Sequence, residues 1–150
     1  MKTQNLYSPL KSTLLVVFMV LMIFPITSCS KKFTFLNSSV VPGAKGYVKV
    51  ETDNNNNYTV KVEVTDLAEV ERVNSSKTTY VVWMETEDGN VKNLGQLKSS
   101  TSFLSKRHTA SLETVSSFKP AKIFITTENG TNVQYPGEQE VMTTKNFSVN

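Results

Sequence analysis

The sequence predicts an all-β fold, and three observations carry this prediction. Residues 58–65 alternate between apolar and polar side chains, as in a strand with one buried and one wet face. Residues 80–97 contain an apolar run, a turn at Asp88-Gly89 and a second short apolar segment, which is typical of a hairpin. Turn signals recur at short intervals, without heptads or a long amphipathic helix. Together they predict an immunoglobulin-like antiparallel β-sandwich of about seven or eight strands.

The N-terminus has the organisation of a secretion signal. Lys2 and Lys11 stand without any acid, and an unbroken apolar run follows at Leu14–Phe24. This run is shorter than the roughly 20 residues that a membrane-spanning helix needs, and it suits a signal peptide. Pro25 ends any helix and leaves the following residues extended. We therefore expect residues 1–28 to be a signal-peptide helix that is removed.

The segment Ile26-Thr27-Ser28-Cys29 has the order aliphatic, small, small, cysteine. It resembles the lipobox of bacterial lipoprotein signal peptides. The resemblance implies that the Cys29 thiol receives a diacylglycerol, that the chain is cut before Cys29, and that acyl chains such as palmitate hold the protein in a membrane. Each buried methylene contributes about 0.8 kcal/mol to such anchoring. The alternative is an ordinary signal peptide with a chance cysteine near its cleavage site.

The residues after Cys29 bear on where a lipoprotein is sent. An aspartate directly after Cys29 would resemble an inner-membrane retention signal, but the residue there is Ser30. An acidic run at the next positions would resemble a surface-export signal, but the residues there are Lys31 and Lys32. Neither signal is present. We expect a lipid-anchored protein of the bacterial outer membrane that faces the periplasm.

Charge gives no sign of a polyanionic partner. The chain has 16 basic and 13 acidic residues, and loss of Lys2 and Lys11 with the signal peptide leaves a nearly neutral domain. The basic residues are scattered and form no block. We therefore expect no nucleic-acid partner.

The mature chain divides into residues 29–43, a lipidated flexible tether, and residues 44–150, the sandwich domain. Asn37-Ser38-Ser39 and Pro42-Gly43 favour the tether. Two phenylalanines, Phe33 and Phe35, are unusual in a solvated tether, so they would dock on the domain, or the first strand would begin earlier.

The first half of the domain predicts two hairpins. Residues 46–52 and 58–65 would pair around a polar turn. Residues 66–77 have apolar positions three apart, which fits a helical turn or, better, a crossover loop between sheets. Residues 78–86 hold the single tryptophan, Trp83, as a central strand and sandwich-core residue, and 91–97 would be their partner.

The second half continues the pattern. Residues 98–107 are predicted to be a loop with Phe103 and Leu104 as its anchors, and residues 109–115 a strand. Residues 122–128 form a second central candidate strand. We then expect a type I′ turn at Asn129-Gly130, after which the chain returns beside that strand from residues 133–135. A closing edge strand at residues 141–147 would follow.

Residues 80–84, 94–97, 125–128 and 136–137 match, in order, framework motifs of a known family: Tyr-x-Val-Trp-aliphatic, Leu-Gly, aliphatic-Thr-x-Glu and Pro-Gly. The chain from about Gly46 to Val141 thus resembles the extracytoplasmic C-terminal domain of the anti-sigma-K factor family. The resemblance implies the fold and a place outside the cytoplasm, and no catalytic residues. The few residues before Leu14 leave no room for a sigma-binding domain, so we expect no anti-sigma activity.

Other chemistry has weak support. His108 and Cys29 are single, so no catalytic triad, disulfide or Cys/His zinc site is expected. Residues Glu85, Glu87 and Asp88 form an acidic turn that lacks EF-hand spacing for calcium. We expect no catalytic, cofactor-binding or metal-binding residues, and Cys29 as the one site, for lipidation.

Three functions follow as hypotheses. The first is a non-enzymatic lipoprotein whose sandwich is an interaction or sensing module for an unknown envelope protein. The second is a carbohydrate-binding or adhesion module with Trp83, Tyr80 or Tyr135 stacking on sugars. The third, a small hydrolase, requires a pair of acids in a pocket.

Overall fold

The computed structural model describes residues 30–100 and 109–149. Within these ranges the chain forms strands and one short helix. Their order is β1 Ser30–Thr34, β2 Lys45–Thr52, β3 Tyr58–Thr65, α2 Val70–Val73, β4 Thr79–Thr86, β5 Val91–Gln96, β6 Lys98–Ser100, β7 Thr109–Ser116, β8 Pro120–Glu128 and β9 Glu140–Thr143.

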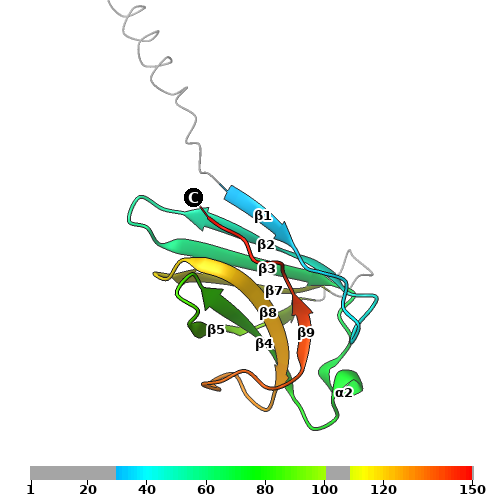
Figure 1. Ribbon diagram of the computed structural model, residues 1–150. Helices are drawn as coiled ribbons and strands as arrows, with labels where there is room; N and C mark the ends of the chain where they lie inside the picture. The colour runs from blue at the N-terminus through cyan, green and yellow to red at the C-terminus, as the bar shows by residue number, and fades with distance from the viewer. Residues whose placement is uncertain (1–29, 101–108, 150) are drawn as a thin grey trace, which may run out of the picture.

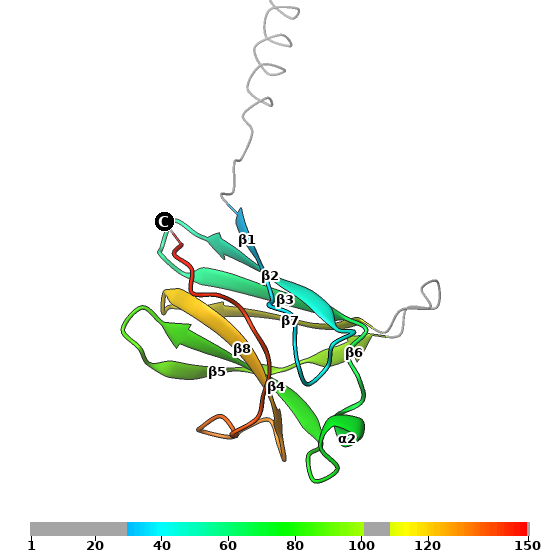
Figure 2. The ribbon, with the colours of Figure 1, turned by 45° about the vertical axis from the view of Figure 1, so that its right-hand side comes forward.

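The strands make two antiparallel sheets that pack face to face as a β-sandwich (Figures 1 and 2). One sheet has the order β1-β2-β3-β7-β6 and the other has the order β5-β4-β8-β9. The predicted all-β sandwich is thus confirmed. Seven strands follow the order of immunoglobulin constant-type sheets: β2-β3-β7-β6 on one side and β4-β8-β9 on the other. The closer assignment to the immunoglobulin-like class stays a prediction.

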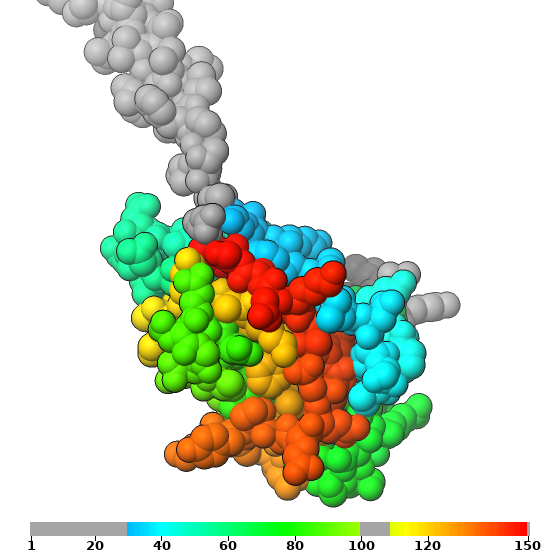
Figure 3. All heavy atoms as spheres, viewed as in Figure 1, coloured from blue at the N-terminus to red at the C-terminus, as the bar shows by residue number. Residues whose placement is uncertain are grey.

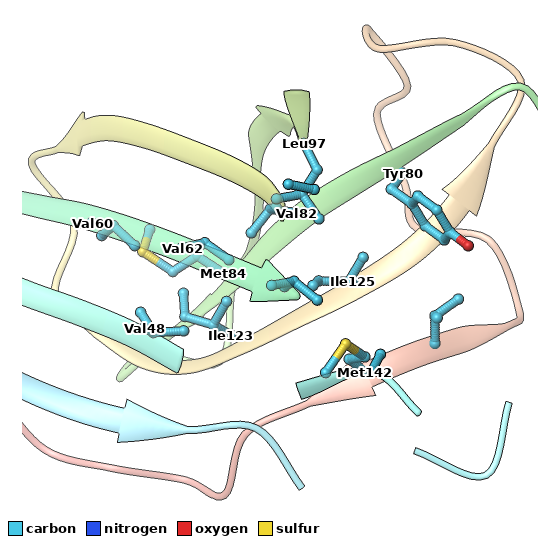
Figure 4. Close-up of a cluster of buried hydrophobic side chains, with 14 of the residues drawn as sticks. Val48, Val60, Val62, Tyr80, Val82, Met84, Leu97, Ile123, Ile125 and Met142 are labelled. Atoms are coloured by element: carbon cyan, nitrogen blue, oxygen red, sulfur yellow. The ribbon is translucent and has the colours of Figure 1, made fainter. Parts of the chain in front are cut away.

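The space between the sheets is filled by branched and sulfur-containing side chains (Figure 4). Strands β2, β3, β4 and β8 contribute every second residue, because side chains alternate between the two faces of a sheet. The buried central set is Val48, Val50, Val60, Val62, Val64, Tyr80, Val82, Met84, Ile123, Ile125 and Met142.

The predicted hairpins are present. Strand β3 has the expected alternation, with Tyr58, Val60, Val62 and Val64 buried and the residues between them half-buried. It pairs with β2 and, on its other side, with β7. Strand β4 is buried over almost its whole length and lies between β5 and β8, as its continuous apolar run predicts.

The predicted tether is in part a strand. Residues 30–34 form β1, which pairs in register with β2 from Ser30 opposite Glu51 to Thr34 opposite Tyr47. The Phe33 ring stacks on Phe147, with ring centroids 3.9 Å apart. Apolar side chains with partners on the domain thus hold this segment to the sheet edge. Within the expected tether of residues 29–43, residues 30–34 are thus a strand and not flexible, and the alternative of an earlier first strand is confirmed.

The crossover between the sheets contains both features that the spacing of residues 66–77 suggested. Strand β3 ends at Thr65, and the next residue, Asp66, has a positive φ of 56°. The chain then passes to the other sheet and makes the single turn of α2, whose side chains include no buried residue. Beyond it, residues 98–100 form the short strand β6 rather than loop. The proposed anchors Phe103 and Leu104 lie outside the described residues.

Trp83 is fully buried, but it does not belong to the core between the sheets. Along β4, Tyr80, Val82 and Met84 face the other sheet, so Val81 and Trp83 face outward. There they form a second cluster with Phe124 of β8, and Val133 covers it. The prediction of Trp83 as a sandwich-core residue was wrong in its location, because the strand period places it on the opposite face.

The segment that covers this outer cluster was predicted as a hairpin. Asn129 has no positive φ, so a type I′ turn at Asn129-Gly130 does not form. Instead residues 129–139 run without a strand before β9 returns beside β8. This segment spreads over the lower end of the molecule in Figure 3. The closing edge strand is thus confirmed, although it is shorter than predicted.

Candidate functional site

Cys29, the residue expected to be lipidated, lies outside the described residues. The first described residue after it, Ser30, is exposed and opens β1, an edge strand of the five-stranded sheet. Lys31 donates to the carbonyl of Ser148 at 3.5 Å, and the C-terminal segment runs beside β1 (Figure 3). The peptide next to Cys29 is therefore at the surface, at one end of the sandwich.

The opposite end of the sandwich carries a cavity of about 510 Å³. It lies between the crossover around α2 and the chain ends of β4, β5 and β7. Half of its described lining is apolar, including Leu67, Val70, Leu97 and Ala110, and the remainder is mainly hydroxyl and amide side chains. The only acid in that lining, Glu69, pairs with Arg72 at 3.4 Å. The described residues therefore place no pair of acids in this cavity.

Tyr80 forms one wall of the cavity. Its hydroxyl donates to the carbonyl of Ala68 at 2.9 Å, which fastens the crossover to β4. Burial, and to a smaller extent the negative charge of Glu71, raises the pKa of Tyr80 to about 12. A tyrosine in such a place holds a turn and resists ionisation, so it is unsuited to act as a base near neutral pH.

The raised pKa of Tyr80 predicts a loss of stability at alkaline pH. The neutral phenol is favoured in the folded state, so its contribution is complete below pH 10 and disappears as pH rises from about 10 through 12. We expect Tyr80→Phe to flatten the pH dependence of unfolding in that window and to reduce the late step of the phenolate absorbance titration, to which Tyr47 also contributes because its bond to Glu63 raises its pKa. Tyr135→Phe, at an 81% exposed residue, is the control that should leave both unchanged. A late step of unchanged amplitude in Tyr80→Phe would contradict this assignment.

A buried polar chain joins the outer cluster to the covering segment. The indole Nε1 of Trp83 donates to Thr126 Oγ1 at 2.8 Å, and Thr126 Oγ1 donates to Glu128 Oε1 at 2.6 Å. The same carboxylate oxygen accepts from the Gly137 amide at 2.6 Å, and Lys77 Nζ lies 3.9 Å from the other oxygen. Glu128 is only 4% exposed. The buried carboxylate thus has bonded partners at one oxygen and an ion partner at the other, which fits a structural clasp.

Sequence reasoning did not assign this clasp. Residues 125–128 appeared there only as a framework motif. The alternation of side chains along β8 could have indicated it, because Phe124, Thr126 and Glu128 share one face of the strand. Phe124 is the cross-strand partner of Trp83 on β4, so this face is the one that carries Trp83. The partner that completes the clasp, Gly137, lies in a segment without regular pattern and could not be predicted.

The aromatic residues considered for sugar binding are not brought together. Trp83 and Tyr80 are buried on opposite faces of the four-stranded sheet, and Tyr135 alone is exposed. These three residues therefore form no stacking platform.

The structure describes the acidic turn at residues 85–88 but not the single histidine. Glu87 binds Lys119 at 2.8 Å, at the turn between β4 and β5. Within residues 30–100 and 109–149, no group of three or more histidine, cysteine, aspartate or glutamate side chains could hold a metal ion. His108 is outside the described residues.

Comparisons with known proteins leave the chain without an assigned relative. No family model matches it, and neither does any curated protein or solved structure. Among the helices that the structure describes, none has the length and apolar character to cross a membrane.

Proposed function

We propose that the protein is a lipoprotein of the bacterial envelope, held in the membrane by acyl chains on Cys29. The lipobox-like segment Ile26-Thr27-Ser28-Cys29, placed after Leu14–Phe24, is the observation that carries the proposal. The exposed start of β1 at Ser30 supports it, because a residue just before an exposed edge strand is open to modification. Placement in the outer membrane, facing the periplasm, follows from the residues after Cys29.

The sandwich itself would act as a non-enzymatic interaction or sensing module for an envelope protein. The motifs shared with the extracytoplasmic domain of anti-sigma-K factors support this role, without anti-sigma activity. The geometry agrees with it: the cavity lies at the end of the sandwich away from Ser30, where a partner would find it clear of the membrane. A carbohydrate-binding or adhesion role is the second proposal, supported by the exposed ring of Tyr135.

The anchor is tested by Cys29→Ala in cells fed a radioactive fatty acid. We expect the wild type to carry the label and to sediment with outer membranes, and the variant to lose the label and leave the membrane fraction. Ser28→Ala is the matched control, because alanine is also small and keeps the lipobox order. Label that persists in Cys29→Ala, or a wild type without label, would refute the proposal.

A further inference from the structure

Several turns gather at the end of the sandwich where β1 begins (Figure 1). Ser30 lies opposite Glu51 at the end of β2, and Ser117 bonds Asn57 across the neighbouring turns at 3.3 Å. The pair of Glu87 with Lys119 joins the turn of the other sheet to them. This end, called the anchor end below, consists of the turns 53–57, 87–90 and 117–119, the start of β1, and residues 145–149.

Three exposed apolar side chains lie close to the anchor end, while Leu36 and Tyr135 are exposed elsewhere on the domain. Val91, Val115 and Phe118 are 40%, 65% and 51% exposed, at the start of β5, at the end of β7 and in the turn that follows β7. The ammonium of Lys92 lies 4.8 Å from the centre of the Phe118 ring. An aromatic ring with a lysine beside it suits the boundary between lipid headgroups and acyl chains.

The length of chain between the lipid and the fold restricts where the domain can sit. Cys29 directly precedes Ser30, and two residues span at most about 7 Å. Lipid on Cys29 therefore keeps the start of β1 at the bilayer surface. The turn that holds Phe118 follows β7, three strands from β1 in the sheet order, which is about 14 Å across the sheet at the same end.

We propose that the anchor end rests on the lipid bilayer, with Phe118 in the headgroup layer and the strands upright. This inference rests on the proposed lipidation of Cys29 and adds the orientation of the domain. The competing pose lies on the β1 edge and leaves Phe118 in water. In the upright pose the cavity is roughly 30 Å from the bilayer, the length of the nine-residue strand β8.

Charge does not determine this contact. Two of the acids near the anchor end have basic partners: Glu51 pairs with Lys49 at 2.7 Å, and Glu87 with Lys119. The Asp53 carboxylate accepts from the backbone and side chain of Asn57, and these bonds hold its pKa below the usual value. Asp88 and Lys92 add charges of both signs at this end, so we expect the apolar contact to form on vesicles without net charge.

The orientation can be measured on the lipidated mature protein in phosphatidylcholine vesicles. The Cys29 sulfur is then a thioether, so an introduced cysteine is the only free thiol. Nitroxide labels at Ser117→Cys, Asn55→Cys and Gln134→Cys report exposure to oxygen, which enters lipid, and to a water-soluble nickel chelate. These positions mark the Phe118 turn, the turn near β1 and the far end.

We expect the labels at residues 117 and 55 to have a several-fold higher ratio of oxygen to nickel exposure than the label at 134. Adding Phe118→Ser to Ser117→Cys should lower the ratio at 117, because the ring no longer holds the turn in the headgroups. A water-like ratio at 117 with a lipid-like ratio at 55 would show the pose on the β1 edge and overturn the inference. An unchanged ratio with Phe118→Ser would overturn the role of Phe118.

Mass spectrometry of the purified protein before reconstitution separates the two proposals. A protein without acyl chains on Cys29 would overturn the proposed lipoprotein and, with it, the orientation. A lipidated protein with a water-like label at 117 would overturn the orientation alone.

Discussion

Replacing Trp83 with alanine is expected to lower the free energy of unfolding by about 3–5 kcal/mol. The side chain is fully buried, its ring lies near that of Phe124 with centroids 6.4 Å apart, and Nε1 bonds Thr126. Removing it would leave a cavity under the segment that contains Val133. Chemical denaturation of wild type and variant measures the difference.

Trp83→Phe is the matched control. It keeps an aromatic ring against Phe124 and loses the bond to Thr126 Oγ1, so we expect a smaller cost of about 1–2 kcal/mol. Trp83 is the only tryptophan, and its fluorescence in the wild type should be blue-shifted and resistant to a water-soluble quencher. A cost below about 1 kcal/mol for Trp83→Ala, or emission typical of solvated indole, would contradict the buried outer cluster.

Glu128→Ala is expected to cost about 3 kcal/mol, although the residue is charged. The substitution leaves Thr126 Oγ1 and the Gly137 amide without their acceptor and Lys77 without its ion partner. Since these contacts hold residues 129–139 over the outer cluster, we also expect the Trp83 emission to shift to longer wavelength. Denaturation and fluorescence of the same samples measure both effects.

Glu128→Gln tests whether the clasp depends on the negative charge of Glu128 or on the position of its side-chain oxygen. The amide oxygen can still accept a hydrogen bond, so the cost should be less than half that of alanine and the Trp83 emission should stay near its wild-type position. A double-mutant cycle of Glu128→Gln with Trp83→Phe should show coupling, because both side chains bond Thr126. Additive effects together with an unchanged emission in Glu128→Ala would refute the clasp.

The parts of the fold that were predictable have a regular local pattern. The alternation of residues 58–65 was sufficient to place β3, since one face of the strand is buried and the other is only half-buried. The continuous apolar run of β4 correctly indicated a central strand. Period alone also places Trp83 on the opposite face from Tyr80, yet the prediction assigned it to the inner core because a buried tryptophan is usual there.

The parts that were not predictable depend on contacts distant in sequence. Residues 30–34 resemble a tether until Phe147 is known to stack on Phe33. Asn129-Gly130 has the composition of a tight turn, but the bond from Gly137 to Glu128 and the bonds of Asn93 to the carbonyls of Thr131 and Val133 favour a long covering segment. Local turn chemistry is overruled there by the apolar surface that needs cover.

The early start of β1 also changes the expected relation between domain and membrane. A lipid on Cys29 would have no long flexible tether between it and the sandwich, because pairing with β2 begins at Ser30. The domain would then sit on the bilayer, and the cavity near Tyr80 would face the opposite way.

The mass of the N-terminal tryptic peptide from membrane-extracted protein tests the central claim most directly. Trypsin cuts after Lys31, so we expect a peptide Cys29-Ser30-Lys31 that carries a diacylglycerol thioether and an acylated amine. A mature N-terminus at any other residue, or an unmodified Cys29 thiol, would contradict it.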